Sequence, residues 1–239
     1  MRSEVILLAT VHRLHHYLPF YTPEHLRRAL AHFDPDVLCA EVPPLRYLSH
    51  IDLRRKPELK EVILPFTRAR HIPLHSLAPG DPERKAMAHE QMICAGGMAG
   101  EWGSSFERYC LSGRYFPLIS SWRSIPDLYS ARTGAFIRKC LVQQEGRYRE
   151  IQTMAWVDWN IYYLGRILEA IEIYPHRRIL AAVGVDHLHW LEGKLSGLAG
   201  VHLLDAAALL QGRSFEEPGE SGLPEATRTG MVKEAIPHS

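Results

Sequence analysis

The sequence shows no strong excess of charge of either sign and no long hydrophobic run. Its 28 lysines and arginines are balanced by 27 acidic residues, which gives a formal net charge of +1. Such a balance provides no general attraction to nucleic acid or to an anionic membrane. No apolar run approaches the roughly 20 residues that a membrane-spanning helix needs, and no N-terminal signal region is visible. We therefore expect a soluble, cytoplasmic protein with neither a nucleic-acid nor a membrane partner.

Cysteines are also few, and none of the four belongs to a CxxC pair. Metal-binding and redox-active cysteines often occur in such pairs. We interpret all four as reduced, structural residues. Histidines, in contrast, number 14. Only their placement can therefore mark any of them as functional.

Short apolar runs alternate with helical patterns along the first third of the chain. This alternation is typical of a parallel sheet that is covered by helices on both faces. The pattern returns near residue 179, in "RRILAAVGVDHLHW". We expect an α/β fold with a central, largely parallel sheet flanked by helices. The predicted strands are 5–9, 37–40, one ending near His75, 179–183 and "VHLLD", and the early predicted helices are 23–33 and 58–70.

The 239 residues are enough for one sizeable core, and we expect a single domain over residues 1–211. A helical insertion is predicted around 85–175, ending in a long helix over 146–174. Residues 212–239 are rich in Gly, Pro, Glu and Ser without apolar periodicity, so they are predicted to be disordered. The expected core stripe of the long helix is Met154, Val157, Ile161, Leu164, Leu168 and Ile171.

Three predicted strands are followed by unusual polar residues, namely His12, Glu41 and His187. In open parallel sheets, ligands bind beyond the carboxyl ends of the strands. Two imidazoles and a carboxylate are the ligand types of a hydrolytic metal site, where a divalent ion activates water. The same residues could instead act without a metal, with a histidine as general base that Glu41 orients. The residues leave both alternatives open.

Other polar residues lie near these strand ends. His75 ends the third predicted strand and is a supporting candidate for substrate binding. We interpret the segment after the late strand as a loop in which His187 is the ligand and His189 is not, while Asp186 orients a neighbouring histidine. His16 and Tyr17 follow the first strand and are candidates for contact with the substrate.

The segments "LLATVHRLHHY", "DPDVLCAEV" and "LAAVGVDHL" occur in that order, with a large gap before the last. Together they resemble three motifs of the TraB/Tiki, ChaN and erythromycin-esterase-like superfamily. These are a Gly-Thr-x-His after the first strand, a Pro-Asp-hydrophobic-Glu strand, and a late Gly-x-x-His. The resemblance covers residues 4–205. One departure is Ala9, which replaces the glycine of the first motif.

The resemblance implies a hydrolase with a cleft lined by the two histidine motifs and the glutamate. Some members of the superfamily are regarded as metal-dependent peptidases, others as esterases whose histidine activates water, and one branch binds haem. The segment "RYREIQTMAWVDWN" partly matches a further motif of the family, on the predicted long helix. By this resemblance Arg149 would hold an oxyanion or a substrate carboxylate, and Asn160 would contact the substrate.

Our leading hypothesis is a hydrolase that cleaves an ester, lactone or peptide bond in a small molecule or a peptide. His12, Glu41 and His187 would hold zinc, manganese, cobalt or iron, or would activate water directly. A second hypothesis is a non-catalytic protein that binds a metal, or haem through His12, His15 or His16. A third is a scaffold that has lost its function, for which Ala9 is the only indication. The sequence indicates neither the substrate nor the oligomeric state.

Overall fold

A computed structural model describes residues 2–50, 53, 56–80, 116–142 and 147–211. Within these ranges the side chains of 48–50, 116, 140–142 and 147–155 are not described. The predictions for the remaining segments, including the disordered tail over 212–239 and most of the insertion between 85 and 115, lie outside the described residues.

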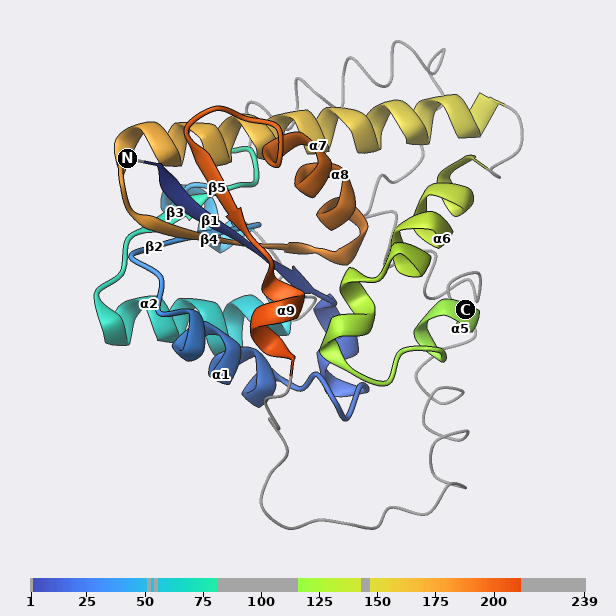
Figure 1. The fold of residues 1–239 in the computed structure, drawn as a ribbon, viewed down its shortest axis with the longest axis horizontal. Coiled ribbons are helices and arrows are strands. Elements are labelled where there is room, and N and C mark those ends of the chain that lie inside the picture. Colours follow the sequence, from blue (N-terminus) through green and yellow to red (C-terminus); the bar gives the residue numbers. More distant parts are fainter. Residues whose placement is uncertain (1, 51–52, 54–55, 81–115, 143–146, 212–239) are drawn as a thin grey trace.

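Five parallel strands form one central sheet (Figure 1). The order across the sheet is β3-β2-β4-β1-β5, so β4, which is late in the chain, lies between β1 and β2. The predicted α/β fold with a largely parallel sheet is therefore confirmed. The strands are β1 (Ser3–Thr10), β2 (Val37–Ala40), β3 (Leu74–Ser76), β4 (Arg178–Gly184) and β5 (Val201–Leu204).

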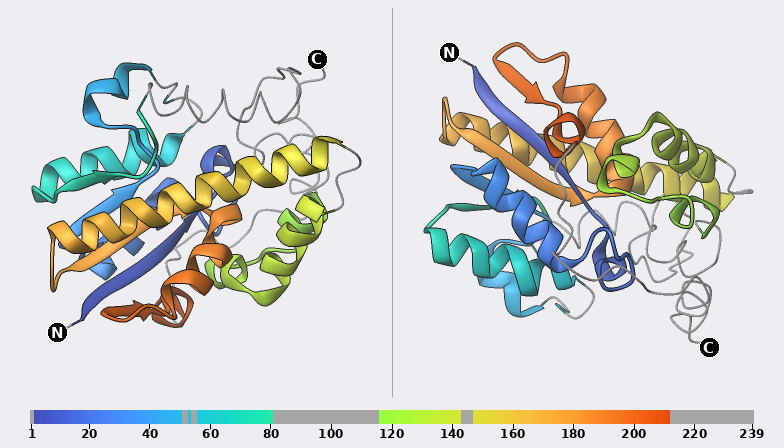
Figure 2. Two further views of the ribbon diagram at one scale, coloured as in Figure 1. Left: turned by 90° about the horizontal axis from the view of Figure 1, so that it is seen from above. Right: turned by 60° about the horizontal axis from the view of Figure 1, so that its bottom comes forward.

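Helices cover both faces of the sheet. The helices α1 (Pro23–Phe33) and α2 (Leu64–Arg70) lie on one face, and α7 (Arg147–Ile173) and α8 (Val185–Leu195) lie on the other (Figures 1 and 2). None of the described helices combines the length and the apolar character that crossing a bilayer requires.

The shorter helices are α5 (Phe116–Ile119), α6 (Ala131–Val142) and α9 (Ala206–Leu210). The 3-10 segments are η1 (His12–His16), η2 (Leu45–His50) and η5 (Ile125–Tyr129). Segment η4 (Glu58–Ile63) is π-helical and leads into α2.

The predicted first helix is confirmed, and its ends follow from local chemistry. Thr22 caps the helix by accepting a hydrogen bond from the backbone N–H of His25, and Pro23 occupies the first turn. The helix ends at Asp34, which adopts a left-handed conformation with φ of 44°. Four of its residues, Leu26, Ala29, Leu30 and Phe33, are buried against the sheet side of the core.

Helix α7 agrees with the predicted long helix, and the predicted core stripe was partly right. Leu164, Leu168 and Ile171 are partly buried and pack against the core. Ile161 is 55% exposed, whereas Asn160, Tyr163 and Ile167 are almost completely buried. Apolar residues occur around the whole circumference of this helix, so the sequence pattern does not fix which side faces the sheet. The observed buried side places Asn160 and Tyr163 beside the carboxyl ends of the strands.

The segment after β4 is a helix, and the prediction of a loop there was wrong. Helix α8 begins at Val185, immediately after the last residue of β4. Val185, Leu188 and Leu191 recur at helical spacing and are all buried. In a helix, residues two positions apart point in different directions, so His187 and His189 cannot share one orientation.

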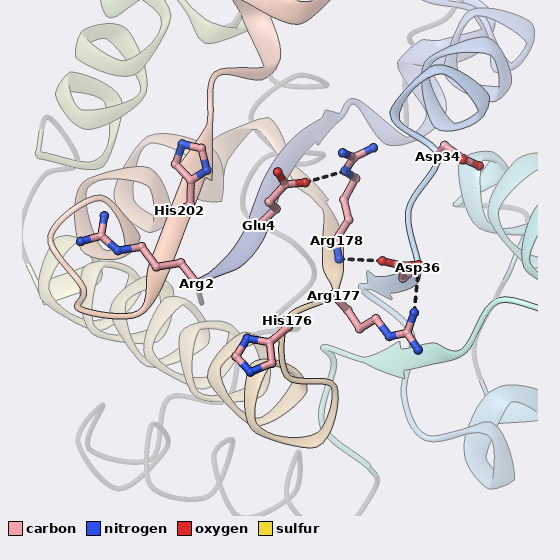
Figure 3. A pocket seen from close by; sticks show the side chains of 8 residues that line it. All are labelled: Arg2, Glu4, Asp34, Asp36, His176, Arg177, Arg178 and His202. Atoms are coloured by element: carbon pink, nitrogen blue, oxygen red, sulfur yellow. Dashed lines mark hydrogen bonds and ion pairs between the residues drawn. The ribbon is translucent and has the colours of Figure 1, made fainter.

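Ion pairs join the amino ends of β1, β2 and β4 (Figure 3). Arg178 Nε lies 2.8 Å from Glu4 Oε2, and its backbone N–H donates to Asp36 Oδ2 at 2.9 Å. These groups border an open hollow of about 800 Å³. The pairs hold the strands together at the end of the sheet opposite to His12 and Glu41.

Candidate functional site

His12 lies directly beyond β1 in a buried and conformationally unusual position. It begins segment η1 with φ of 49°, which is left-handed and costs energy for a side chain of this kind. The residue is 3% exposed, and its Nδ1 lies 2.7 Å from Oε1 of Glu58. The backbone at this position therefore turns the histidine inward, towards a carboxylate from η4.

Glu41 follows β2 and connects that strand to β4. Its Oε1 accepts a hydrogen bond from the backbone N–H of Gly184 at 2.5 Å. Its Oε2 lies 2.9 Å from Lys56 Nζ and 4.0 Å from His12 Nε2. The side chain is 6% exposed. Glu41 is thus fixed between the last residue of β4, an ammonium group and the imidazole of His12.

His187 lies in the first turn of α8, and its hydrogen bonds define its tautomer. Asn160 Nδ2 donates to the backbone oxygen of Trp156 at 2.7 Å, so Oδ1 of the same amide is the atom that faces His187. His187 Nδ1 lies 3.2 Å from this oxygen and must carry a proton in order to donate to it. In the neutral ring, Nε2 then has a free lone pair. It lies 3.5 Å from Asp186 Oδ2.

Two contacts bring the groups of α8 together with those beyond β1 and β2. The ring of Tyr163 packs edge-on against His187 at a centroid distance of 5.0 Å, and its hydroxyl interacts with the carboxylate of Glu41. A Cβ placed on Gly184 would lie 2.6 Å from Asp186 Oδ1 and 3.3 Å from both Glu41 Oε1 and His12 Nε2. These three atoms, from Asp186, Glu41 and His12, therefore surround one point, where only glycine leaves space.

The charges of this cluster are strongly coupled. Burial opposes the charged form of His12, but the carboxylates of Glu58 and Glu41 outweigh burial and raise the pKa of His12 to about 9. Burial also disfavours both carboxylates, yet Lys56 and His12 hold the pKa of Glu41 and of Glu58 below the usual range. At neutral pH His12 is therefore an imidazolium between two carboxylates.

Two oxygens of the cluster are buried without a hydrogen-bond partner among the described residues, Glu58 Oε2 and Asp186 Oδ1. Buried polar atoms usually have a partner, and unpaired ones commonly occur at functional sites. Both oxygens belong to carboxylates that flank His12 or His187. They make this part of the molecule suited to a polar ligand rather than to simple core packing.

The other candidates from the sequence lie elsewhere. His16 is exposed and pairs with Glu61 at 3.4 Å, and Tyr17 is 44% exposed. His75 is buried on β3, where its Nε2 lies 3.9 Å from Glu169 on α7. The side chain of Arg149 lies outside the described residues. Of the predicted substrate-binding residues, only Asn160 contacts the cluster formed by His12, Glu41 and His187.

His15 has a structural environment. It is completely buried, its Nε2 accepts a hydrogen bond from the backbone N–H of Val11, and its Nδ1 lies 2.8 Å from the carbonyl oxygen of Tyr21. Burial lowers the pKa of His15 to about 4. Both ring nitrogens are thus used to hold the turn after β1.

Three residues of the cluster were missed by the sequence analysis: Lys56, Glu58 and Tyr163. Lys56-Pro57-Glu58 is an ordinary way to begin a helix, and Glu58 was predicted only as the first residue of the helix over 58–70. Tyr163 is buried but did not belong to the predicted core stripe of α7. No local signal distinguishes any of the three, because their roles arise from the packing of their segments in the fold.

The predicted metal ligands do not form a recognisable metal centre. No group of three His, Cys, Asp or Glu side chains in the described part of the chain is arranged to hold a metal ion. His12 Nδ1 is directed to Glu58, and Lys56 contacts the oxygen of Glu41 that faces His12. The described residues do supply two histidines for proton transfer, the imidazolium of His12 and the ring of His187, whose Nδ1 donates to Asn160.

Comparison of the chain with protein-family models, with curated proteins and with solved structures found no match.

Proposed function

We propose that the protein is a cytoplasmic hydrolase of the TraB/Tiki and erythromycin-esterase-like type, in which His187 and His12 act as base and acid on an ester, lactone or peptide bond. One observation carries this proposal. His12 Nε2 and Asp186 Oδ1 both face the Cβ position of Gly184, and Oδ2 of Asp186 lies 3.5 Å from Nε2 of His187. A buried histidine that is charged at neutral pH and a histidine whose Nδ1 donates to Asn160 therefore both lie near the carboxylate of Asp186. An acid–base pair of this kind assists hydrolysis, because water must lose a proton while the leaving group gains one.

His187 is the base in this proposal. Asn160 holds the Nδ1 proton, so Nε2 is the atom that accepts a proton from the attacking water. The carboxylate of Asp186, 3.5 Å from Nε2, stabilises the imidazolium that forms. An acid beside a catalytic histidine commonly has this stabilising role. The hydroxide released in this step attacks the carbonyl carbon of the substrate.

His12 is the acid. Its Nδ1–H is held by Glu58, which leaves the Nε2–H to donate to the oxygen or nitrogen of the leaving group. As the bond between the carbonyl carbon and the leaving group breaks, His12 becomes neutral. Exchange with solvent then returns a proton to His12 and removes one from His187, so the cycle is balanced. Lys56 and the backbone N–H of Gly184 keep Glu41 ionised, and Glu41 in turn favours the charged His12.

The test uses three substrates that represent the three bonds: 4-nitrophenyl acetate, dihydrocoumarin and a short peptide. We expect the wild-type protein to hydrolyse at least one of them, and His187→Ala and His12→Ala to reduce turnover by roughly 10²–10⁴-fold with unchanged far-UV circular dichroism. His202→Ala is the matched control, since His202 is exposed on β5. Full activity in both variants, or no turnover of any substrate with or without added divalent metal, would reject the proposal.

The same assay tests the predicted divalent metal. Metal content and turnover are measured before and after chelation of the purified protein. Turnover that is lost on chelation and restored by zinc, manganese, cobalt or iron would show that the ion supplies the activation of water. Turnover that is unchanged after chelation would support activation by His187 alone.

A further inference from the structure

A cavity of about 370 Å³ lies between α6, α7 and α8. Its size falls within the range of typical small-molecule sites. Trp156 and Trp190 provide aromatic surface, and Gly134 and Gly193 line it without side chains. The ring of His189 packs so closely on Gly134 that a Cβ there would lie 2.8 Å from it, whereas a Cβ on Gly193 would meet no atom within 4 Å. The space beside Gly193 is therefore open.

This cavity, which we call the α6–α8 pocket, adjoins the candidate active site. Asp186 lines the pocket, and its Oδ2 lies 3.5 Å from His187 Nε2. Trp156 also lines it, and its ring is nearly parallel to that of His187, with a centroid distance of 6.4 Å. The backbone oxygen of Asp186 accepts a hydrogen bond from Trp156 Nε1 at 3.3 Å. A ligand in the pocket would therefore contact Asp186 and Trp156, which both also lie beside the proposed base, His187.

Apart from Asp186, the charged lysine and arginine side chains that line the pocket among the described residues are positive. Arg138 and Lys194 both line it and both are exposed to solvent. Within the described residues, neither forms an ion pair with an acid, and Lys194 Nζ lies 5.3 Å from the centroid of the Trp190 ring. Among the described residues, the only acid that lines the pocket is Asp186, which is buried. A ligand with a planar ring and an anionic group at its outer end matches this distribution of charge.

We propose that the α6–α8 pocket binds the aromatic ring of a carboxylate-bearing ligand, with the ring against Trp156 and Trp190 and the carboxylate at Arg138 and Lys194. The pocket then selects substrates in which an aromatic acid is joined to the bond that is cleaved. The second statement, that the bound ring is part of the substrate, rests on the proposed function. Binding of an aromatic carboxylate does not require catalysis.

The probe is 2-naphthoate, and binding is measured by isothermal titration calorimetry. We expect saturable binding to the wild-type protein and at least tenfold weaker binding to Gly193→Leu, whose new side chain enters the open space. Leucine is preferred to glycine within helices, so this variant should fold at least as well as the wild type. Gly165→Leu is the matched control, because Gly165 lies on α7 with no atom within 4 Å of its Cβ position and does not line the pocket.

The charge requirement is tested with Arg138→Gln and Lys194→Gln. Each should weaken 2-naphthoate binding several-fold, and Arg132→Gln, an exposed change on the same helix as Arg138, should not. The uncharged naphthalene-2-carboxamide should bind wild type and both variants equally. Absence of saturable 2-naphthoate binding, or equal binding to wild type and Gly193→Leu, would overturn the proposal.

The two proposals fail in different ways. His187→Ala should keep 2-naphthoate binding while it loses turnover. Binding that depends on Gly193, in a protein that hydrolyses no substrate, would contradict the proposed function and support the pocket. Turnover that depends on His187, without binding of 2-naphthoate, would support the proposed function and contradict the pocket.

Discussion

Nδ1 of His12 lies 2.7 Å from Oε1 of Glu58, although 46 positions separate the two residues along the chain. The contact joins the turn after β1 to the π-helical segment that precedes α2. Both side chains are less than 5% exposed. A buried ion pair is a costly arrangement unless each partner is held by further interactions, and it is sensitive to the loss of either partner.

Replacing Glu58 by glutamine should lower both the pKa of His12 and the stability of the fold. The amide preserves the shape and a hydrogen bond but removes the charge that most strongly favours the imidazolium. We expect the free energy of unfolding at pH 7 to fall by about 1–3 kcal/mol, measured by denaturant unfolding, and the His12 resonance to titrate at lower pH in NMR spectra.

Glu61→Gln is the control for this change, since Glu61 is a partly exposed acid in the same segment that pairs with His16. Its effect on stability should stay within about 0.5 kcal/mol. If His12 titrates at the same pH in wild type and in Glu58→Gln, the pair does not set the charge of His12.

Stability should be greatest near pH 6.5. The pKa of His12 is raised from 6.5 to about 9. Its contribution to the free energy of unfolding is therefore complete below pH 6.5 and is lost as the pH rises through 9. The pKa of His15 is lowered from 6.5 to about 4, so its contribution is present above pH 6.5 and is lost as the pH falls through 4. The alkaline loss from His12 alone should reach up to about 3 kcal/mol.

The measurement is denaturant unfolding between pH 4 and pH 10, with His12→Asn and His15→Asn as paired variants. His12→Asn should flatten the alkaline side of the stability curve and leave the acid side, whereas His15→Asn should do the reverse. Identical alkaline slopes in wild type and His12→Asn would contradict the raised pKa of His12.

Gly184→Ala should disable the site while the fold persists. The added Cβ would lie 2.6 Å from Asp186 Oδ1 and would fill the point that His12 and Glu41 also face. We expect turnover to fall at least tenfold and the free energy of unfolding to fall by about 1–3 kcal/mol. Gly197→Ala, where no atom lies within 4 Å of the Cβ position, should change neither quantity appreciably. A fully active Gly184→Ala protein would place the reacting atoms elsewhere.

Local patterns predicted much of the fold. Strand β2 coincides with the predicted residues 37–40, because four consecutive buried residues have clear polar and proline boundaries. Helix α1 was predicted because Thr22 and Pro23 form a recognisable helix start. The start of α8 was misread, because a glycine after a buried strand and a pair of histidines resemble a loop.

The cluster itself was only partly predictable. A general property of parallel sheets placed His12, Glu41 and His187 at one end of the sheet. It did not reveal that β4 lies between β1 and β2, which is what brings the backbone N–H of Gly184 to Glu41. Glu58 and Tyr163 join the cluster through the packing of η4 and α7, and packing of this kind leaves no periodic signal in the sequence.

The central claim is that His12 and His187 work as one acid–base pair, and a double-mutant cycle tests it most directly. Turnover is measured for wild type, His12→Ala, His187→Ala and the double variant, at equal concentrations of folded protein. Residues that act as a unit give losses that do not multiply. We predict that the double variant is no more than a few-fold slower than the slower single variant. A loss in the double variant equal to the product of the two single losses, or full activity in either single variant, would contradict the account.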